Sequence, residues 1–351
     1  MLQLSKLILC SLLSLCFMSR GSSPYNTISK GQQPQITTDN KGIVRVVFGG
    51  ADSIFCSTSS NQGKTFSKPV LVGVVPKMHL GMARGPQLAT SADYSVITAM
   101  DQKGDIHFFV LKHNEGGWER KGFVNDVRSS APEGLMNIAA DKQNNFYATW
   151  LDLRAGKSNN IYFSSIAVSK TDKWLKNSLI YKSPDGHVCE CCRPSIAVQG
   201  SQVAIMFRNW LLGSRDLYLI KSNNRGETFA AAQKLGNGTW KLNACPMDGG
   251  GLSFNNSNSI NTVWQRQGIV YACEPGKMEI ELGNGRDCSI ISNNDQEIVA
   301  MGSNGDLKLK YLKTNKEIFI GKGSYLKTLS LPGDHILCVW QDDDTIKSKV
   351  M

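Results

Sequence analysis

The chain repeats one pattern of hydrophobic and polar positions seven times. Each copy starts with a few small or apolar residues, passes through a polar turn, and continues as an alternating apolar run that ends in a large side chain. Alternation with a period of two predicts β-strands, and a polar turn between two such runs predicts a hairpin. The large residues that end the runs are Phe48, Met100, Trp150, Phe207, Trp264, Met301 and Trp340.

The spacing of these copies approximates the period of roughly 40–50 residues that is typical of propeller blades. All hairpins except the last are followed by enough chain for two more strands, whereas the last copy has only residues 345–351 left. A strand near residues 25–28 is expected to complete it, because closing the ring in this way removes exposed sheet edges. The pattern therefore predicts an all-β fold: a single β-propeller over residues 22–351, with seven four-stranded antiparallel blades.

Residues 1–21 differ from the rest of the chain. Lys6 precedes an apolar run over residues 7–18, which is followed by Ser19-Arg20-Gly21. A short apolar run behind one positive charge, with small residues after it, is typical of a signal peptide, so we expect a secreted or periplasmic protein. Leu15 lies where a lipoprotein signal needs a small residue, which argues against a lipid anchor on Cys16. No other segment is long and apolar enough to predict a transmembrane helix.

The formal net charge of +10 narrows the class of partner. A basic surface attracts acidic carbohydrates and glycoconjugates, although it also serves simply to keep a protein soluble. The chain has no run of Lys and Arg and no recognisable nucleic-acid-binding motif, so we expect no nucleic-acid partner. An acidic carbohydrate is the predicted ligand, and a protein partner is the alternative.

Two turns between outer strands share the pattern S-x-N-x-G-x-T-F, at residues 59–66 and 222–229. The pattern resembles the Asp-box of sialidase-like (BNR-repeat) propellers, with Asn in place of Asp. Residues 185–194 and 243–251 resemble segments of bacterial exo-sialidase-like proteins. The resemblance covers nearly the whole mature chain and implies six blades, where the repeat count indicates seven.

The antiparallel order of the strands determines which loops share an end of the ring. The loops from the fourth strand of one blade to the first of the next lie at the same end as those between second and third strands. These loops are rich in Arg, Cys and acidic residues, whereas the turns at the other end are chemically plain. We therefore expect the functional site on the loop-rich end, toward blades two to five.

A sialidase binds a carboxylate with arginines and uses an acid/base carboxylate and a Tyr nucleophile. The resemblance therefore implies a glycoside hydrolase, with no cofactor, as one function; a non-catalytic scaffold is the alternative, with the arginines joining blades. The candidate substrate-binding residues are Arg84, Arg154, Arg193, Arg208, Arg266 and Asp248. The candidate catalytic residues are Asp101, Glu133, Asp152 and Tyr271.

Eight cysteines remain outside the signal peptide, and an even number in an exported chain favours disulfides. Cys189, Cys191 and Cys192 precede one blade and Cys245 precedes the next, so we favour a disulfide between this cluster and Cys245. The alternative is a soft-metal site for copper(I) or zinc, because three thiols so close in sequence cannot all pair locally. His187, Cys245 and Met247 are the further candidate ligands for such a site.

Overall fold

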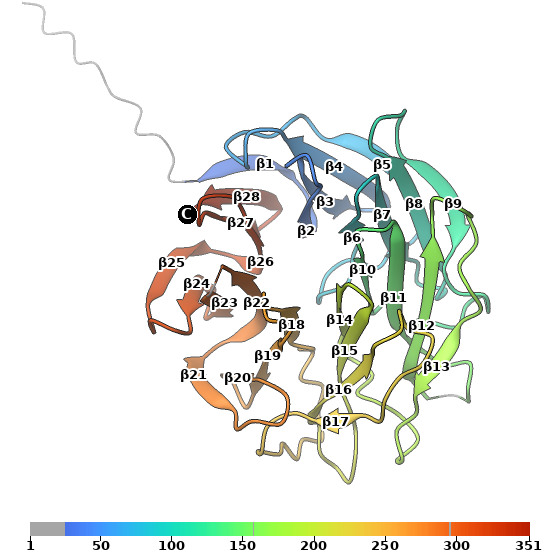
Figure 1. The fold of residues 1–351 in the computed structure, drawn as a ribbon, viewed down its shortest axis with the longest axis vertical. Helices are drawn as coiled ribbons and strands as arrows, with labels where there is room; N and C mark the ends of the chain where they lie inside the picture. Colours follow the sequence, from blue (N-terminus) through green and yellow to red (C-terminus); the bar gives the residue numbers. More distant parts are fainter. Residues whose placement is uncertain (1–24, 157, 295) are drawn as a thin grey trace, which may run out of the picture.

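The computed structural model describes residues 25–351 apart from 157 and 295, and shows a seven-bladed β-propeller (Figure 1). Each blade is a four-stranded antiparallel sheet, and the seven blades stand around a central axis. The prediction of seven blades from the repeats is confirmed, and the six blades implied by the resemblance are not found. The predicted signal peptide, residues 1–21, lies outside the described residues.

The strands take the same order in every blade. The innermost strands are β2 (Gln32–Thr38), β6 (Gln87–Thr90), β10 (Met136–Ala140), β14 (Ser195–Gln199), β18 (Gly251–Phe254), β22 (Arg286–Asn293) and β26 (Ser324–Ser330). The second strands are β3 (Val44–Gly50), β7 (Tyr94–Met100), β11 (Asn145–Asp152), β15 (Gln202–Arg208), β19 (Ile260–Arg266), β23 (Gln296–Ser303) and β27 (Ile336–Asp342). The third strands are β4 (Ser53–Ser59), β8 (Ile106–Lys112), β12 (Asn160–Ala167), β16 (Leu217–Ser222), β20 (Ile269–Cys273), β24 (Asp306–Tyr311) and β28 (Thr345–Val350). The outermost strands are β5 (Val70–Val74), β9 (Glu119–Phe123), β13 (Ser178–Tyr181), β17 (Gln233–Lys234), β21 (Ile280–Asn284), β25 (Glu317–Lys322) and β1 (Asn26–Lys30).

The last blade is completed by the start of the chain. Strand β1 pairs antiparallel with β28, with Asn26 opposite Ser348, so the blade's strand order is β1-β28-β27-β26. Tyr25 packs edge-on against Trp340, with 5.9 Å between the ring centroids. The predicted closure by an N-terminal strand is therefore confirmed, and it joins the two ends of the described chain in one sheet.

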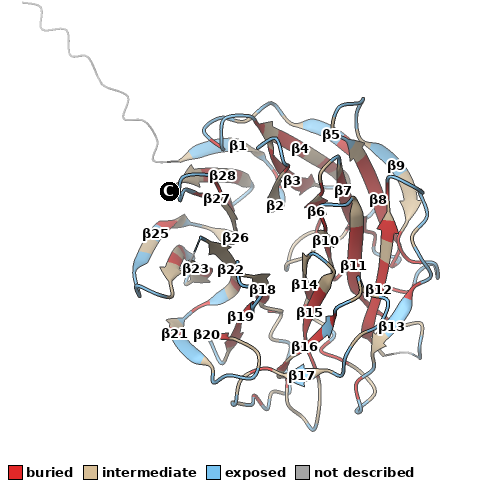
Figure 2. Ribbon diagram, in the orientation of Figure 1, coloured by how far each residue is buried: buried red, intermediate tan, exposed pale blue. Residues whose placement is uncertain are grey.

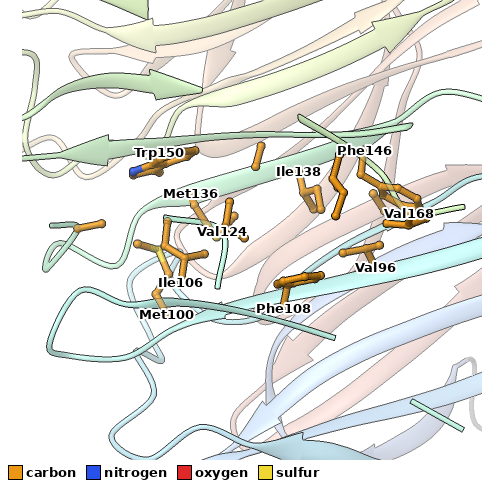
Figure 3. Close-up of a cluster of buried hydrophobic side chains, with 14 of the residues drawn as sticks. Val96, Met100, Ile106, Phe108, Val124, Met136, Ile138, Phe146, Trp150 and Val168 are labelled. Atoms are coloured by element: carbon orange, nitrogen blue, oxygen red, sulfur yellow. The ribbon is translucent and has the colours of Figure 1, made fainter. Parts of the chain in front are cut away.

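The hydrophobic core lies between neighbouring blades. The described residues form seven apolar clusters, one for each interface between adjacent blades. Figure 3 shows the interface where Met100 and Phe108 meet Ile138 and Trp150. In Figure 2 the second and third strands are mainly buried, whereas the outermost strands are largely exposed. The large residue that ends each repeat is buried in its second strand, which explains why the repeat is visible in the sequence.

The S-x-N-x-G-x-T-F turns close by side-chain to backbone hydrogen bonds. Ser59 Oγ accepts from the Gly63 N–H at 2.9 Å, and Asn61 Oδ1 accepts from the Thr65 N–H at 3.0 Å. The copy at residues 222–229 makes the same two bonds at the same distances. Gly63 has φ +80°, a conformation that a side chain disfavours. The motif therefore acts as a brace for the turn, at the end of the ring opposite the wide loops.

The described part of the chain contains no helix that is long and apolar enough to cross a membrane.

Candidate functional site

A cavity of about 220 Å³ lies on the axis of the ring, at the loop-rich end. We call it the axial cavity. It is smaller than the ~300–1,000 Å³ pockets that enclose drug-sized ligands, so it suits a terminal group rather than a whole chain of sugars. Innermost strands of several blades line it with residues at equivalent positions. These positions are Gln35, Asn137, Ser195, Gly251, Ser289 and Lys327.

Two basic side chains and two carboxylates line the axial cavity: Arg193, Lys327, Asp248 and Asp287. Lys327 is the one charged member of the six equivalent strand positions. Both cations lie within electrostatic range of both carboxylates, yet neither forms an ion pair within the described residues. The cavity therefore presents two basic side chains, neither of which is in direct contact with a carboxylate.

The enclosure shifts the pKa values of three of these groups, and burial lowers the pKa of Arg193. Burial, with the nearby Arg193 guanidinium as the second cause, lowers the pKa of Lys327 to about 7. Burial and then the charge of Asp248 raise the pKa of Asp287 above its usual value. All three shifts disfavour the charged form, as expected where water is largely replaced by protein. An anion in the cavity would favour the protonated form of Lys327.

The loops that carry Arg193 and Asp248 are held against each other. Arg193 Nη1 donates to Gln87 Oε1 at 3.0 Å, and the Asp248 carboxylate accepts from the N–H groups of Gly250 at 3.1 Å and Asp287 at 2.8 Å. A Cβ atom at Gly249 would lie 1.9 Å from the Arg193 carbonyl oxygen. Only glycine fits there, and the consecutive glycines after Asp248 allow the two loops this close approach.

Sequence reasoning missed Lys327 and Asp287, because it placed the site toward the blades with long loops. Asp287 and Tyr325 each lie two residues after the single glycine that connects two blades, have positive φ, and lie at a bulge near the start of an innermost strand. Gln33 repeats this arrangement in the first blade. A shared Gly-x-x at residues 31–33, 285–287 and 323–325 was the available signal. Non-glycine residues with positive φ cost energy and cluster at functional sites.

Two of the predicted site residues, Arg84 and Glu133, are brought together by adjacent blades. Arg84 Nε donates to the Glu133 carbonyl oxygen at 2.5 Å, and Arg84 Nη2 lies 3.8 Å from Glu133 Oε2. Burial raises the pKa of Glu133, with the Arg84 charge opposing that shift. Neither residue lines the axial cavity. Their contacts join the loops of two blades.

Arg154 and Asp152 form a buried network in the third blade. Asp152 is fully buried and accepts from Ser130 Oγ at 2.7 Å, Trp150 Nε1 at 2.7 Å and Arg154 Nη2 at 2.8 Å. Arg154 also pairs with Asp126 on the preceding outer connection. All these groups satisfy one another within the protein, so the network braces the loop-rich end.

Arg208 joins two blades from a fully buried position. It is 1% exposed, and its guanidinium donates to the carbonyl oxygens of Asp248 at 3.0 Å, Arg215 at 2.8 Å and Gln265 at 2.9 Å. With its donors directed at backbone oxygens, Arg208 is placed to hold the Asp248 loop rather than to meet a ligand. Arg208 therefore fits the alternative in which the arginines join neighbouring blades.

Three further candidate residues make local contacts away from the axial cavity: Arg266, Tyr271 and Asp101. Arg266 pairs with Glu279 through a bidentate contact and stacks over the Tyr271 ring at 4.2 Å. Asp101 Oδ1 accepts from the backbone of its own turn, and Asp101 Oδ2 lies 3.1 Å from His107 Nε2. None of the three lines the axial cavity. The structure thus brings Arg193 and Asp248 together at the axis and leaves the other predicted residues in separate local networks.

The four cysteines of the predicted cluster lie in the connections that precede β14 and β18. Cys189 Sγ lies 3.3 Å from Cys192 Sγ and 3.7 Å from Cys191 Sγ. All eight cysteines in the described residues carry free thiols in this structure, and Cys245 is exposed. The hydrogen bonds of the neighbouring thiols, with the Arg215 charge as a smaller cause, lower the pKa of Cys189.

The comparisons with known proteins place the chain among β-propellers by its fold. No protein-family model and no curated protein matches the sequence. Among solved structures, the chain is similar to the BP39L lectin from Burkholderia pseudomallei (TM-score 0.65, 11% identity, covering 91% of this chain and 94% of that chain). It is also similar to the polysaccharide lyase Uly1 (TM-score 0.54, 10% identity, 93% and 91% covered) and to U3-55K (TM-score 0.52, 12% identity, 92% and 97% covered). At such identities the likeness shows a shared β-propeller fold and no more.

Proposed function

We propose that the protein binds an acidic carbohydrate, with one anionic substituent of the ligand seated in the axial cavity. Arg193 and Lys327 are the two groups that meet this substituent. The observation that carries the proposal is the pair of cations that line one cavity without an ion pair among the described residues. A guanidinium and an ammonium suit carboxylate and sulfate, because charge-assisted hydrogen bonds are the strong ones.

Further polar groups in the axial cavity support a hydroxyl-rich ligand. Ser289 and Thr328 line the cavity, and their hydroxyl oxygens are buried without a hydrogen-bond partner among the described residues. Buried polar atoms are normally paired, so these two hydroxyls would gain partners if they turned toward a ligand hydroxyl or a water in the cavity. The carbohydrate class is also supported by the similar solved propellers that are a lectin and a polysaccharide lyase by name. The positive net charge of the chain would draw an acidic ligand toward it.

The contacts of the predicted catalytic residues favour binding over sialidase-type hydrolysis. Asp152 is buried beneath Arg154, and Tyr271 lies under Arg266. An acid/base carboxylate and a Tyr nucleophile would need to face one substrate. The carboxylates that do face the axial cavity are Asp248 and Asp287. We therefore assign them to ligand hydroxyls or to balancing the two cations.

Replacing Arg193 by glutamine tests the proposal directly. We expect the variant to bind sulfated and carboxylated oligosaccharides about ten- to a hundredfold more weakly, because a hydrogen bond to a charged group contributes ~1.5–3 kcal/mol. The measurement is fluorescence polarisation with labelled oligogalacturonate and labelled sulfated galactan oligosaccharide, with a neutral cello-oligosaccharide as the reference ligand. Wild-type affinity should also fall as salt is added.

Lys142→Gln is the matched control, because it also removes one positive charge but from the opposite end of the ring, where Lys142 lies exposed. We expect its affinity to equal that of the wild type. Equal losses in the two variants would mean that only the net charge matters. No preference for the acidic ligands in the wild type would also refute the proposal, and would favour a protein partner on the loop-rich end.

A further inference from the structure

Three thiols converge beside the axial cavity and serve no role in the proposed carbohydrate binding. The Sγ atoms of Cys189, Cys191 and Cys192 all lie within 4.8 Å of one another. Cys189 and Cys192 are buried, at 0% and 1% exposure, and Cys191 is half-buried. Cys189 Sγ lies 3.3 Å from Cys192 Sγ and 3.7 Å from Cys191 Sγ, close enough for the sulfurs to share one metal ion, because metal–sulfur distances are ~2.3 Å for a d¹⁰ ion such as zinc.

The backbone around the three thiols is fixed by neighbouring strands. The Val188 N–H donates to the Asn159 carbonyl at 2.9 Å, and the Cys189 N–H donates to the Arg208 carbonyl at 3.0 Å. These bonds hold the start of the cysteine segment against the third and fourth blades. The sulfur atoms are therefore placed by the fold, and the site does not depend on a freely moving loop.

Two arginines make the environment of the sulfurs positive. Arg215 is buried and donates from Nη1 to Cys189 Sγ at 3.0 Å, while its Nε donates to the Leu242 carbonyl at 3.1 Å. The guanidinium also lies over the Trp210 ring, 4.5 Å from its centroid. Arg208 lies within electrostatic range of Cys189 and Cys192. A cluster of thiolates around a monovalent cation carries net negative charge, which these two guanidinium groups would balance.

The other metal ligands that the sequence suggested do not belong to the group of three mutually close sulfurs. His187 Nδ1 lies 2.9 Å from the Val188 carbonyl oxygen, and the ring stacks on Trp210. Met247 lines the axial cavity. Cys245 is exposed, on the connection before the next blade; its thiol lies within hydrogen-bonding reach of Cys191 but outside the group of three sulfurs that are mutually close. The inner set of ligands is therefore three sulfurs, with no imidazole among them.

We propose that Cys189, Cys191 and Cys192 bind one copper(I) ion as a three-thiolate site, releasing their protons to solvent. Thiolates prefer soft ions, and copper(I) and zinc(II) are the common choices. Structural zinc takes four nitrogen or sulfur ligands, whereas the cluster supplies three. The number of ligands therefore favours copper(I), and the two arginines favour the negative charge of such a complex. This site differs from the axial cavity and requires no carbohydrate.

The test is a competition for copper(I) under anaerobic conditions. The full chain, reduced and freed of metal, is titrated with copper(I) in the presence of bicinchoninic acid, and elemental analysis gives the bound copper per protein. We expect one equivalent, a sulfur-to-copper charge-transfer band in the near ultraviolet, and a first shell of three sulfurs by X-ray absorption. Cys191→Ser, at the half-buried position, should lose at least tenfold in affinity while keeping its thermal melting profile.

Cys245→Ser is the control, because it removes a neighbouring thiol outside the proposed set. We expect it to bind copper(I) as the wild type does. An equal loss in Cys245→Ser, or retention of zinc(II) in preference to copper(I), would show a four-ligand site and overturn the proposal.

Peptide mapping of protein purified without reductant gives an independent check, since a disulfide from the cluster to Cys245 that persists would also overturn the proposal. None of these readouts depends on carbohydrate binding.

Discussion

Replacing Asp152 by alanine is expected to lower the free energy of unfolding by about 3–5 kcal/mol, the cost of leaving a buried charge without its partner. Asp152 is 0% exposed and accepts hydrogen bonds from Ser130, Trp150 and Arg154. Without it, the Arg154 guanidinium and the Trp150 N–H lose their buried acceptor. Urea denaturation followed by tryptophan fluorescence measures the change.

Asp126→Ala is the comparison for this prediction, because Asp126 pairs with the same arginine but its side chain is 40% exposed. We expect it to lose ~1 kcal/mol or less, as exposed ion pairs do. A loss below ~1 kcal/mol in Asp152→Ala, together with loss of an enzymatic activity on glycosides, would contradict the structural role and restore the catalytic one that the resemblance implied.

Replacing Trp340 by alanine is expected to cost ~3–5 kcal/mol, as for other large side chains removed from a core. Trp340 is 1% exposed and packs in the interface between the sixth and seventh blades. It also contacts Tyr25 at the start of the chain, and its Nε1 donates to the Lys322 carbonyl at 3.0 Å. The variant therefore loosens the blade in which the chain ends meet. Thermal and urea unfolding give the magnitude.

Trp340→Phe separates packing from hydrogen bonding. It keeps an aromatic ring in the interface and loses the bond to Lys322, so a cost of about 1–2 kcal/mol is expected, partly from the unpaired carbonyl oxygen. Equal stability of the wild type and Trp340→Ala would mean that closure of the ring does not rest on this interface.

The fold could be read from the sequence because each blade repeats the same burial pattern. Trp150 and Trp340, and their counterparts, lie near the ends of the second strands, and each is buried between blades. The turn at residues 59–66 is a local motif whose Ser, Asn and Gly close the turn by themselves. Such features depend on short-range sequence, and they predicted the strands, the hairpins and the closure of the last blade.

The candidate site was harder to predict, because it depends on which partner each charged side chain finds. Arg193 lies on a loop and Arg208 ends strand β15 at the same end of the ring, yet Arg193 lines the axial cavity and Arg208 is buried against carbonyl oxygens. Nothing in the sequence around either arginine distinguishes these outcomes. Lys327 lies within an innermost strand of a blade with short loops, and only the assembled ring brings it opposite Arg193.

The central claim is that Lys327 and Arg193 bind an anion in the axial cavity, and the pH dependence of binding tests it most directly. The pKa of Lys327 is lowered to about 7, so below pH 7 the free protein already carries the proton that an anion needs. Above pH 7 binding requires uptake of that proton, and affinity should fall by up to tenfold per pH unit until the pKa of Lys327 in the complex is reached.

Isothermal titration calorimetry from pH 5.5 to 9, with a sulfated oligosaccharide that stays ionised throughout, measures this fall. Lys327→Arg keeps the positive charge at every pH in the range and should bind without the decline. Constant affinity in the wild type, or the same decline in Lys327→Arg, would contradict the account.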